Sequence, residues 1–147
     1  MNGTRQKFAL HDSVGHLITR TARIVERRIE ADLRPFGLTR VEWCVLVAVC
    51  EEGKKNPSDI AEFVGIDRTA TSRALRELES AGLIDREMGR DDRRTTEVRL
   101  TEKGLAEFRA VMPLCRETAQ HFHDKLTTDE LGLLRTLLAK LTRDELP

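Results

Sequence analysis

Residues 67–100 read DRTATSRALRELESAGLIDREMGRDDRRTTEVRL, and their apolar period changes once along the stretch. The first half has a helical period, with Asp67 as an N-cap and Gly82 as the stop. Apolar and polar residues then alternate over residues 84–88 and again over residues 96–100. Because a polar, turn-like segment separates these two runs, the stretch predicts one helix followed by a β-hairpin.

Three helices are expected before this stretch. Apolar residues recur at steps of three and four from Leu10 to Leu33, which predicts an amphipathic helix of about six turns. Thr39 and Glu42 form a capping box before a helix that is apolar all round after its first turn. Such a helix must be covered from more than one side, so we expect it at the centre of the molecule. Asn56 caps a third, short helix.

Two more helices are expected after the hairpin. Thr101 caps a long one, and Thr127 with Glu130 forms a second capping box before the last one. The fold class is therefore mainly α with a small β-hairpin: a winged helix-turn-helix over residues 37–100, flanked by helical regions over 1–36 and 101–147.

The flanking helices carry more apolar surface than one small winged helix-turn-helix can cover. We therefore expect them to form a homodimer, since helices from both chain ends can build a two-fold interface. The residues assigned to this interface are Leu10, Leu17, Leu131, Leu134 and Leu138. The alternative for the C-terminal leucines is a core within one protomer.

Composition excludes several classes of protein. The 147 residues are 39% hydrophobic and 34% charged, which is too apolar for a disordered chain and too charged for a membrane protein. No signal sequence is visible and the three cysteines form no CxxC pair, so we expect free thiols and a cytoplasmic location. Lys plus Arg and Asp plus Glu are 25 each, so a nucleic-acid surface would require local clustering of charge.

Such clustering is found in the helix that begins after Asp67. Thr71, Ala74, Leu75 and Leu78 share one arc of this helix, and three arginines with small hydroxyl residues share the opposite arc. Small hydroxyls allow close approach to a DNA groove, and arginines can bind guanine edges or phosphates. Glu77 and Glu79 are placed off most of that arc. The predicted DNA-binding residues of the two middle helices are Ser58, Arg68, Thr69, Ser72, Arg73 and Arg76.

The tip of the hairpin is a second basic cluster, made of Arg90, Asp92, Arg93 and Arg94. Arginines on such a loop can reach a narrow minor groove, where the negative potential attracts them. An aspartate beside an arginine can hold its guanidinium in one orientation. The alternative is an ordinary polar turn.

The motifs of the whole region resemble those of the MarR family of bacterial transcriptional regulators. The resemblance is strongest for Asp92-x-Arg94 followed by Val98-x-Leu100-Thr101-x-x-Gly104. It implies a homodimer that binds a pseudo-palindromic operator as double-stranded DNA, usually as a repressor, and often releases it on binding a small aromatic or anionic effector. It also implies that Arg94 is the minor-groove arginine of the wing and that Asp92 orients it.

An effector pocket could be formed by His16, Arg20 and Trp43, with Arg20 holding an anion. The alternative is core packing for Trp43 and a surface ion pair for Arg20. No spacing favours a metal site, a cofactor or an enzyme nucleophile. The remaining alternative is a winged-helix module that binds proteins instead of DNA, and the basic arc argues against it.

Overall fold

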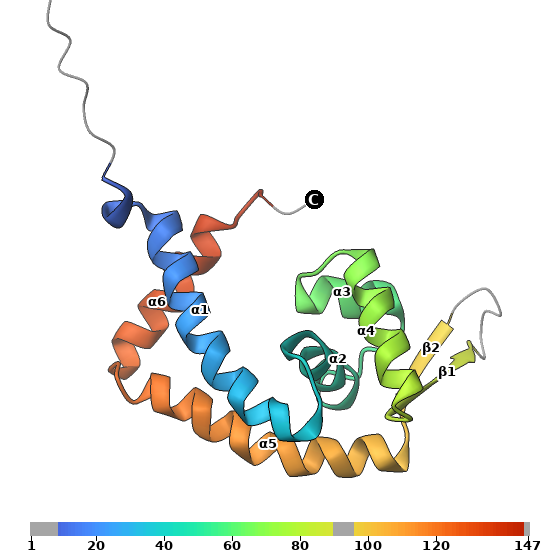
Figure 1. Cartoon of the computed structure of the whole chain (residues 1–147). Coiled ribbons are helices and arrows are strands. Elements are labelled where there is room, and N and C mark those ends of the chain that lie inside the picture. The colour runs from blue at the N-terminus through green and yellow to red at the C-terminus, as the bar shows by residue number, and fades with distance from the viewer. Residues whose placement is uncertain (1–8, 90–95, 146–147) are drawn as a thin grey trace, which may run out of the picture.

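The computed structural model describes residues 9–89 and 96–145 (Figure 1). It is mainly helical with one antiparallel hairpin, which confirms the predicted fold class. The elements in chain order are the 3₁₀ turn η1 (Leu10–Asp12), α1 (Val14–Leu33), the 3₁₀ turn η2 (Arg34–Phe36), α2 (Arg40–Cys50), α3 (Pro57–Val64), α4 (Arg68–Ser80), β1 (Ile84–Met88), β2 (Thr96–Leu100), α5 (Glu102–His123) and α6 (Thr128–Leu141).

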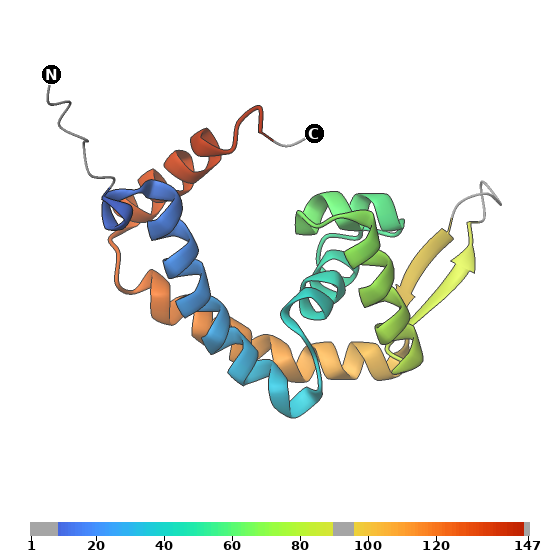
Figure 2. The same cartoon turned by 45° about the horizontal axis from the view of Figure 1, so that its top comes forward.

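The molecule has two ends joined by α5. At one end, α2, α3, α4 and the β1–β2 hairpin form a lobe that we call the reading head (Figure 1). At the other end lie the N-terminal part of α1 and α6, which we call the arm (Figure 2). The helix α5 runs along the side of the molecule from the hairpin to the arm, so the N-terminal part of α1 and α6 lie far from the hairpin.

Both predicted capping boxes are present. Thr39 N–H donates to Glu42 Oε2 at 2.8 Å, and Glu42 N–H donates to Thr39 Oγ1 at 3.3 Å. Thr127 and Glu130 repeat this pair of hydrogen bonds at the start of α6. These bonds satisfy backbone donors that a helix leaves without partners in its first turn, so the sequence determines both starting points.

The first helix starts later than the apolar period indicates. Leu10 belongs to the short turn η1, and α1 begins at Val14. Ser13 between them has an extended backbone, with φ −71° and ψ 123°, which interrupts the helical hydrogen bonding. The apolar spacing continues across this break, and for that reason the pattern does not show it.

The core of the protein surrounds α2, as predicted for a helix that is apolar on all sides. Val45, Leu46 and Ala48 are fully buried. This helix contacts α1, α3, α4, α5 and β2, so it is covered from several directions. Leu75 and Leu78 of α4 and Ile84 of β1 complete the part of the core that fixes the reading head.

The arm has no such core in the part of the chain that the structure describes. Leu33 is the single buried residue of α1, and no residue of α6 is buried. The interface candidates Leu10, Leu17, Leu134 and Leu138 are between 41% and 50% exposed. The C-terminal leucines therefore do not form a core within the protomer. Within residues 9–89 and 96–145, no helix is long and apolar enough to cross a membrane.

Candidate DNA-binding surface

The helix α4 buries the side that its sequence predicts. Thr71, Ala74, Leu75 and Leu78 are all buried, and α4 packs on α2 and α3. The buried Thr71 hydroxyl donates to the carbonyl oxygen of Asp67 at 2.8 Å, which satisfies its hydrogen bond inside the helix. Asp67 Oδ1 accepts from Ala70 N–H at 2.7 Å and caps the helix. These contacts fix which side of α4 faces outward.

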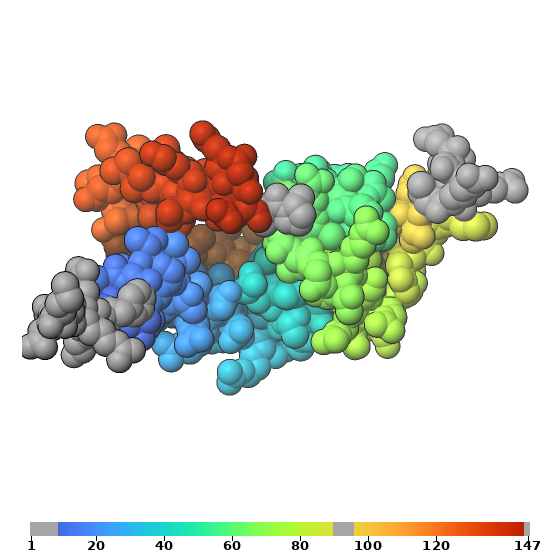
Figure 3. Space-filling view, turned by 90° about the horizontal axis from the view of Figure 1, so that it is seen from above, coloured from blue at the N-terminus to red at the C-terminus, as the bar shows by residue number. Residues whose placement is uncertain are grey.

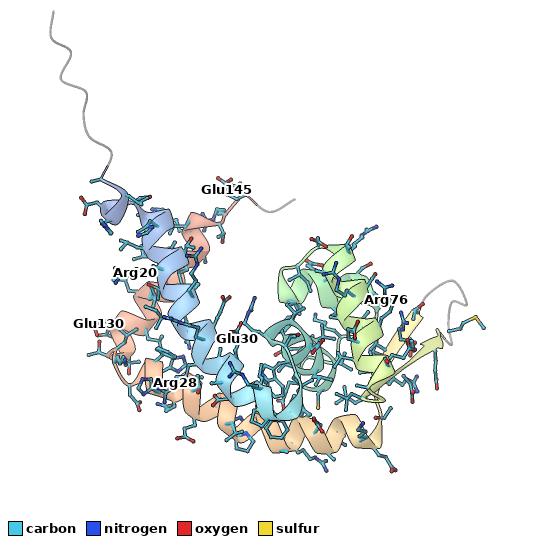
Figure 4. The ribbon with its side chains drawn as sticks, in the orientation of Figure 1. Arg20, Arg28, Glu30, Arg76, Glu130 and Glu145 are labelled. Carbon is cyan, nitrogen blue, oxygen red and sulfur yellow. The ribbon has the colours of Figure 1, made fainter. Side chains whose placement is uncertain are left out.

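The outward side carries the predicted basic and hydroxyl residues. We call this set the recognition face: Arg68, Thr69, Ser72, Arg73 and Arg76. All of its side chains are exposed, and Arg76 projects from α4 away from α2 (Figure 4). No arginine of the set forms an ion pair with any residue that the structure describes. No described carboxylate neutralises the positive charge of the recognition face, which therefore favours an anionic partner.

Glu79 corrects one detail of the sequence analysis. It follows Ser72 by seven residues, so it lies on nearly the same side of the helix, about two turns further along. Its carboxylate accepts from Arg86 Nε on β1 at 2.9 Å and from Arg86 Nη2. The hydrogen bond from Arg86 is the main cause that lowers the pKa of Glu79. An acidic group on the outward side is thus matched by a cation from the hairpin.

Ser58 lies at the start of α3. It is exposed and is the second residue of that helix. Asn56 Oδ1 accepts from Asp59 N–H at 2.9 Å and fixes the helix start. Because α3 packs directly on α4, Ser58 and the recognition face belong to the same lobe.

The hairpin is formed as predicted. Its register pairs Ile84 with Leu100 and Arg86 with Val98. Val98 N–H also donates to the carbonyl oxygen of Lys55 at 2.6 Å, which joins the hairpin to the loop before α3. The predicted tip residues Arg90, Asp92, Arg93 and Arg94 lie outside the described residues, so their DNA contacts stay predictions.

A clasp between α5 and the turn after α4 is a contact that sequence reasoning does not predict. Thr101 Oγ1 donates to the carbonyl oxygen of Gly82 at 2.7 Å, and Lys103 Nζ donates to that of Ala81 at 2.7 Å. Thr101 N–H donates to the carbonyl oxygen of Leu83 at 3.1 Å. Thr101 also caps α5, so the same residue starts the long helix and attaches it to the reading head.

The three effector-pocket candidates do not lie together. His16 and Arg20 line an open groove of about 710 Å³ along α1, together with Arg23 and Arg27. Trp43 is 7% exposed and stacks on Phe108, with ring centroids 5.2 Å apart. Trp43 is therefore part of the core between α2 and α5, in agreement with the alternative interpretation. We call the groove along α1 the α1 groove.

The cysteines have the environment of unreactive thiols. Burial raises the pKa of Cys44, although Arg40 partly opposes this effect. Burial, with a smaller contribution from the Asp32 carboxylate, raises the pKa of Cys115 to about 11. Thiolates are the reactive form of cysteine, so little of either side chain is reactive near neutral pH.

Comparison with known proteins identifies the fold. Residues 36–95 match the model of the MarR family. A mutant MarR from E. coli, solved in complex with operator DNA, has 27% sequence identity over 87% of this chain and 92% of its own, with a TM-score of 0.78. The matched residues include the reading head, and the fold of the chain is that of a MarR-family regulator. The reading head is thus similar to the winged helix-turn-helix of a family of DNA-binding transcription regulators.

Two further solved structures share the MarR-family fold over almost the whole chain. The transcriptional repressor CouR, bound to a 23-mer DNA duplex, has 26% identity over 91% of this chain and 95% of its own, with a TM-score of 0.79. BpsR from Bordetella bronchiseptica, whose DNA binding is regulated by 6-hydroxynicotinic acid, has 23% identity over 93% and 98%, with a TM-score of 0.84. The coverage includes the arm as well as the reading head.

Proposed function

We propose that this chain is a ligand-responsive repressor of the MarR family, active in the cytoplasm, that binds a pseudo-palindromic operator as a homodimer. The observation that carries the proposal is the recognition face of α4, whose arginines are exposed and without acidic partners in the described part of the chain. Arginines at this density favour phosphate and guanine contacts in the major groove. Two relatives with the same fold bind DNA, and one of them is a repressor.

Arg73 tests the major-groove contact. If Arg73 binds a guanine, Arg73→Ala should cost roughly 1–3 kcal/mol and relax preference at one base pair per half-site. The assay is a gel shift with a duplex selected by the wild-type protein from a random pool, followed by a base-substitution series. Arg135→Ala, an exposed arginine of α6, is the control and should bind like the wild type. A uniform loss across all sequences would make Arg73 a phosphate contact instead.

Arg94 tests the wing in the same assay. The minor groove gives degenerate base information, so Arg94→Ala should weaken binding to all duplexes alike. If the side chain neutralises one phosphate, the log–log salt slope should fall by roughly 0.9. Unchanged affinity on every duplex would show that the hairpin is not a DNA-contacting wing.

The exposed leucines of the arm support the homodimer and the proposed dimerisation regions at 1–36 and 101–147. Large apolar side chains on both α1 and α6 lack cover within the described part of the protomer. A second copy would supply it through a two-fold interface and would place two recognition faces about 34 Å apart, one turn of DNA. Figure 3 shows α1 and α6 side by side at the end away from the hairpin, where a partner can approach both.

A chain cut after Leu126 tests the dimer. The truncated chain lacks α6 with Leu134 and Leu138. It should be either insoluble or, if soluble, a monomer in sedimentation velocity. A soluble truncation that stays fully dimeric would contradict the assignment of α6 to the interface.

The α1 groove supports a small anionic effector. His16 and Arg20 share it, and Arg20 supplies a cation that can hold a carboxylate. The relative BpsR responds to an aromatic acid. We expect salicylate-like compounds to weaken operator binding, and Arg20→Ala to reduce this response while leaving DNA binding without ligand unchanged. A broad panel of aromatic acids that leaves DNA affinity unchanged would contradict the effector part of the proposal.

A further inference from the structure

The hairpin contacts the recognition helix through one basic side chain. Arg86 lies in the middle of β1, and its register partner on β2 is Val98. Directly paired residues of an antiparallel ladder project to the same face, and Val98 is fully buried. Arg86 therefore leaves the hairpin on its inner face, on the side where β1 runs beside the end of α4 (Figure 1). There its Nε donates to Glu79 Oε2 at 2.9 Å.

The acceptor lies on the side of α4 that carries the recognition face. Seven residues separate Glu79 from Ser72, so the carboxylate follows the DNA-binding residues along one side of the helix. An unpaired carboxylate at this place would repel the phosphate backbone. Since Arg86 donates two N–H groups to one carboxylate oxygen, the pair both neutralises the charge and fixes the hairpin against the helix.

We propose that the Glu79–Arg86 pair sets the angle between the wing and α4 and thereby aligns the minor-groove contact with the major-groove contact. The inference rests on the proposed DNA binding and adds two positioning residues to it. The hairpin is otherwise anchored at its base through Ile84, and at its middle through the buried Val98 and its hydrogen bond to Lys55 on the β2 side. Among the described residues, the ion pair is the polar link between β1 and the body of α4.

If Arg86 had a different role, the substitution Glu79→Gln would change the affinity for DNA in the opposite direction. If Arg86 served only to bind phosphate, Glu79 would compete with the DNA for it. Replacing Glu79 by Gln would then free the arginine, remove a negative charge near DNA and tighten binding. If the pair positions the wing, the same substitution weakens binding although it removes a negative charge.

The experiment compares wild type, Glu79→Gln and Glu77→Gln on a duplex that the wild type has selected from a random pool. Glu77 is on the same helix, is exposed and makes no ion pair with a described residue. We expect Glu79→Gln to bind roughly two- to fivefold more weakly per reading head, as expected for loss of one exposed ion pair. Its melting temperature should fall by no more than about 4 °C, because one exposed ion pair contributes little to the fold, and hydrogen exchange of the β1 and β2 amides should become faster. Glu77→Gln should bind as tightly as the wild type or slightly more tightly.

The reversed pair Glu79→Arg with Arg86→Glu completes the test. Recovery of wild-type affinity and of slow exchange in the hairpin supports the proposal. Equal or tighter binding by Glu79→Gln overturns it, as does unchanged exchange in β1 and β2. A wild-type protein that selects no duplex would overturn the proposed function instead, and that result does not depend on any variant.

Discussion

Replacing Gly104 by alanine should destabilise the protein, although alanine favours helices. Gly104 lies in the first turn of α5, directly against the segment that follows α4. A Cβ atom built there would stand 1.9 Å from the carbonyl oxygen of Leu83 and 2.8 Å from its carbonyl carbon. Real Cβ atoms keep at least 3.0 Å from such atoms, so the two backbones would have to separate by about 1 Å.

The free-energy cost of adding this methyl group can be compared with the gain in helix propensity. Overpacking of this kind typically costs about 1–3 kcal/mol. The Leu83 oxygen also accepts from Thr101 N–H at 3.1 Å, and lengthening this bond adds about 0.5–1.5 kcal/mol. The gain in helix propensity from Gly to Ala is at most about 1 kcal/mol. Gly104→Ala should therefore lower the free energy of unfolding by roughly 0.5–3.5 kcal/mol.

Gly132 in α6 is the matched control. A Cβ there meets nothing within 4 Å, and the residue is exposed on the side of α6 opposite Leu134 and Leu138. Gly132→Ala should raise the free energy of unfolding by about 0.5–1 kcal/mol. Both variants are measured by urea denaturation at one protomer concentration, because association shifts apparent stability. Shifts of the same sign in the two variants would refute the reasoning.

Further outcomes concern the link between α1 and α5 and the start of α6. Thr118 is buried and its hydroxyl donates to Asp32 Oδ2 at 2.6 Å, so Thr118→Val should cost about 1–3 kcal/mol in urea denaturation. Cys115, with a pKa of about 11, should react with iodoacetamide roughly 100-fold more slowly at pH 8 than a thiol with the ordinary pKa, and its rate should rise up to pH 11. The backbone N–H and hydroxyl of Thr127 lower the pKa of Glu130, so this group stabilises the fold above its ordinary pKa of 4.5. The destabilisation by Glu130→Gln in thermal melts should therefore shrink as the pH falls below 4.5, whereas a pH-independent difference would contradict a role for the ionised carboxylate.

The fold can be predicted from the sequence where local chemistry determines it. Capping boxes at Thr39 and Thr127, and the change of apolar period after Gly82, are each encoded within a few neighbouring residues. The break at Ser13 escapes prediction because both sides of it keep the same apolar spacing. Local sequence patterns therefore predict whether a segment is helix or strand. They do not predict a break in a helix when the apolar spacing is the same on both sides of it.

The site is predictable for the same reason, and prediction fails where distant residues have to meet. The outward side of α4 follows from its helical period, so the sequence alone places its arginines there. Whether Trp43 lies beside His16 and Arg20 depends on how α1, α2 and α5 pack. In the structure Trp43 stacks on Phe108 and belongs to the core instead. The pairing of Glu79 with Arg86 likewise depends on the hairpin folding back beside α4.

The same contacts limit how an effector in the arm can alter DNA binding. The α1 groove lies on α1, which contacts α2 and α5, while the recognition face lies on α4. The helix α2 is at the centre of the core and close-packed cores resist gradual deformation, so displacing it would cost many contacts. The helix α5 is held to the reading head by Thr101 and Lys103 and to α1 by Thr118, so it links α1 to the turn that ends α4. Suppose that α1 can take two positions relative to the reading head and that an effector binds one of them more tightly. The effector would then favour that position, and α5 would transmit the change to α4. The size of the shift is limited by the difference in the effector's affinity for the two positions.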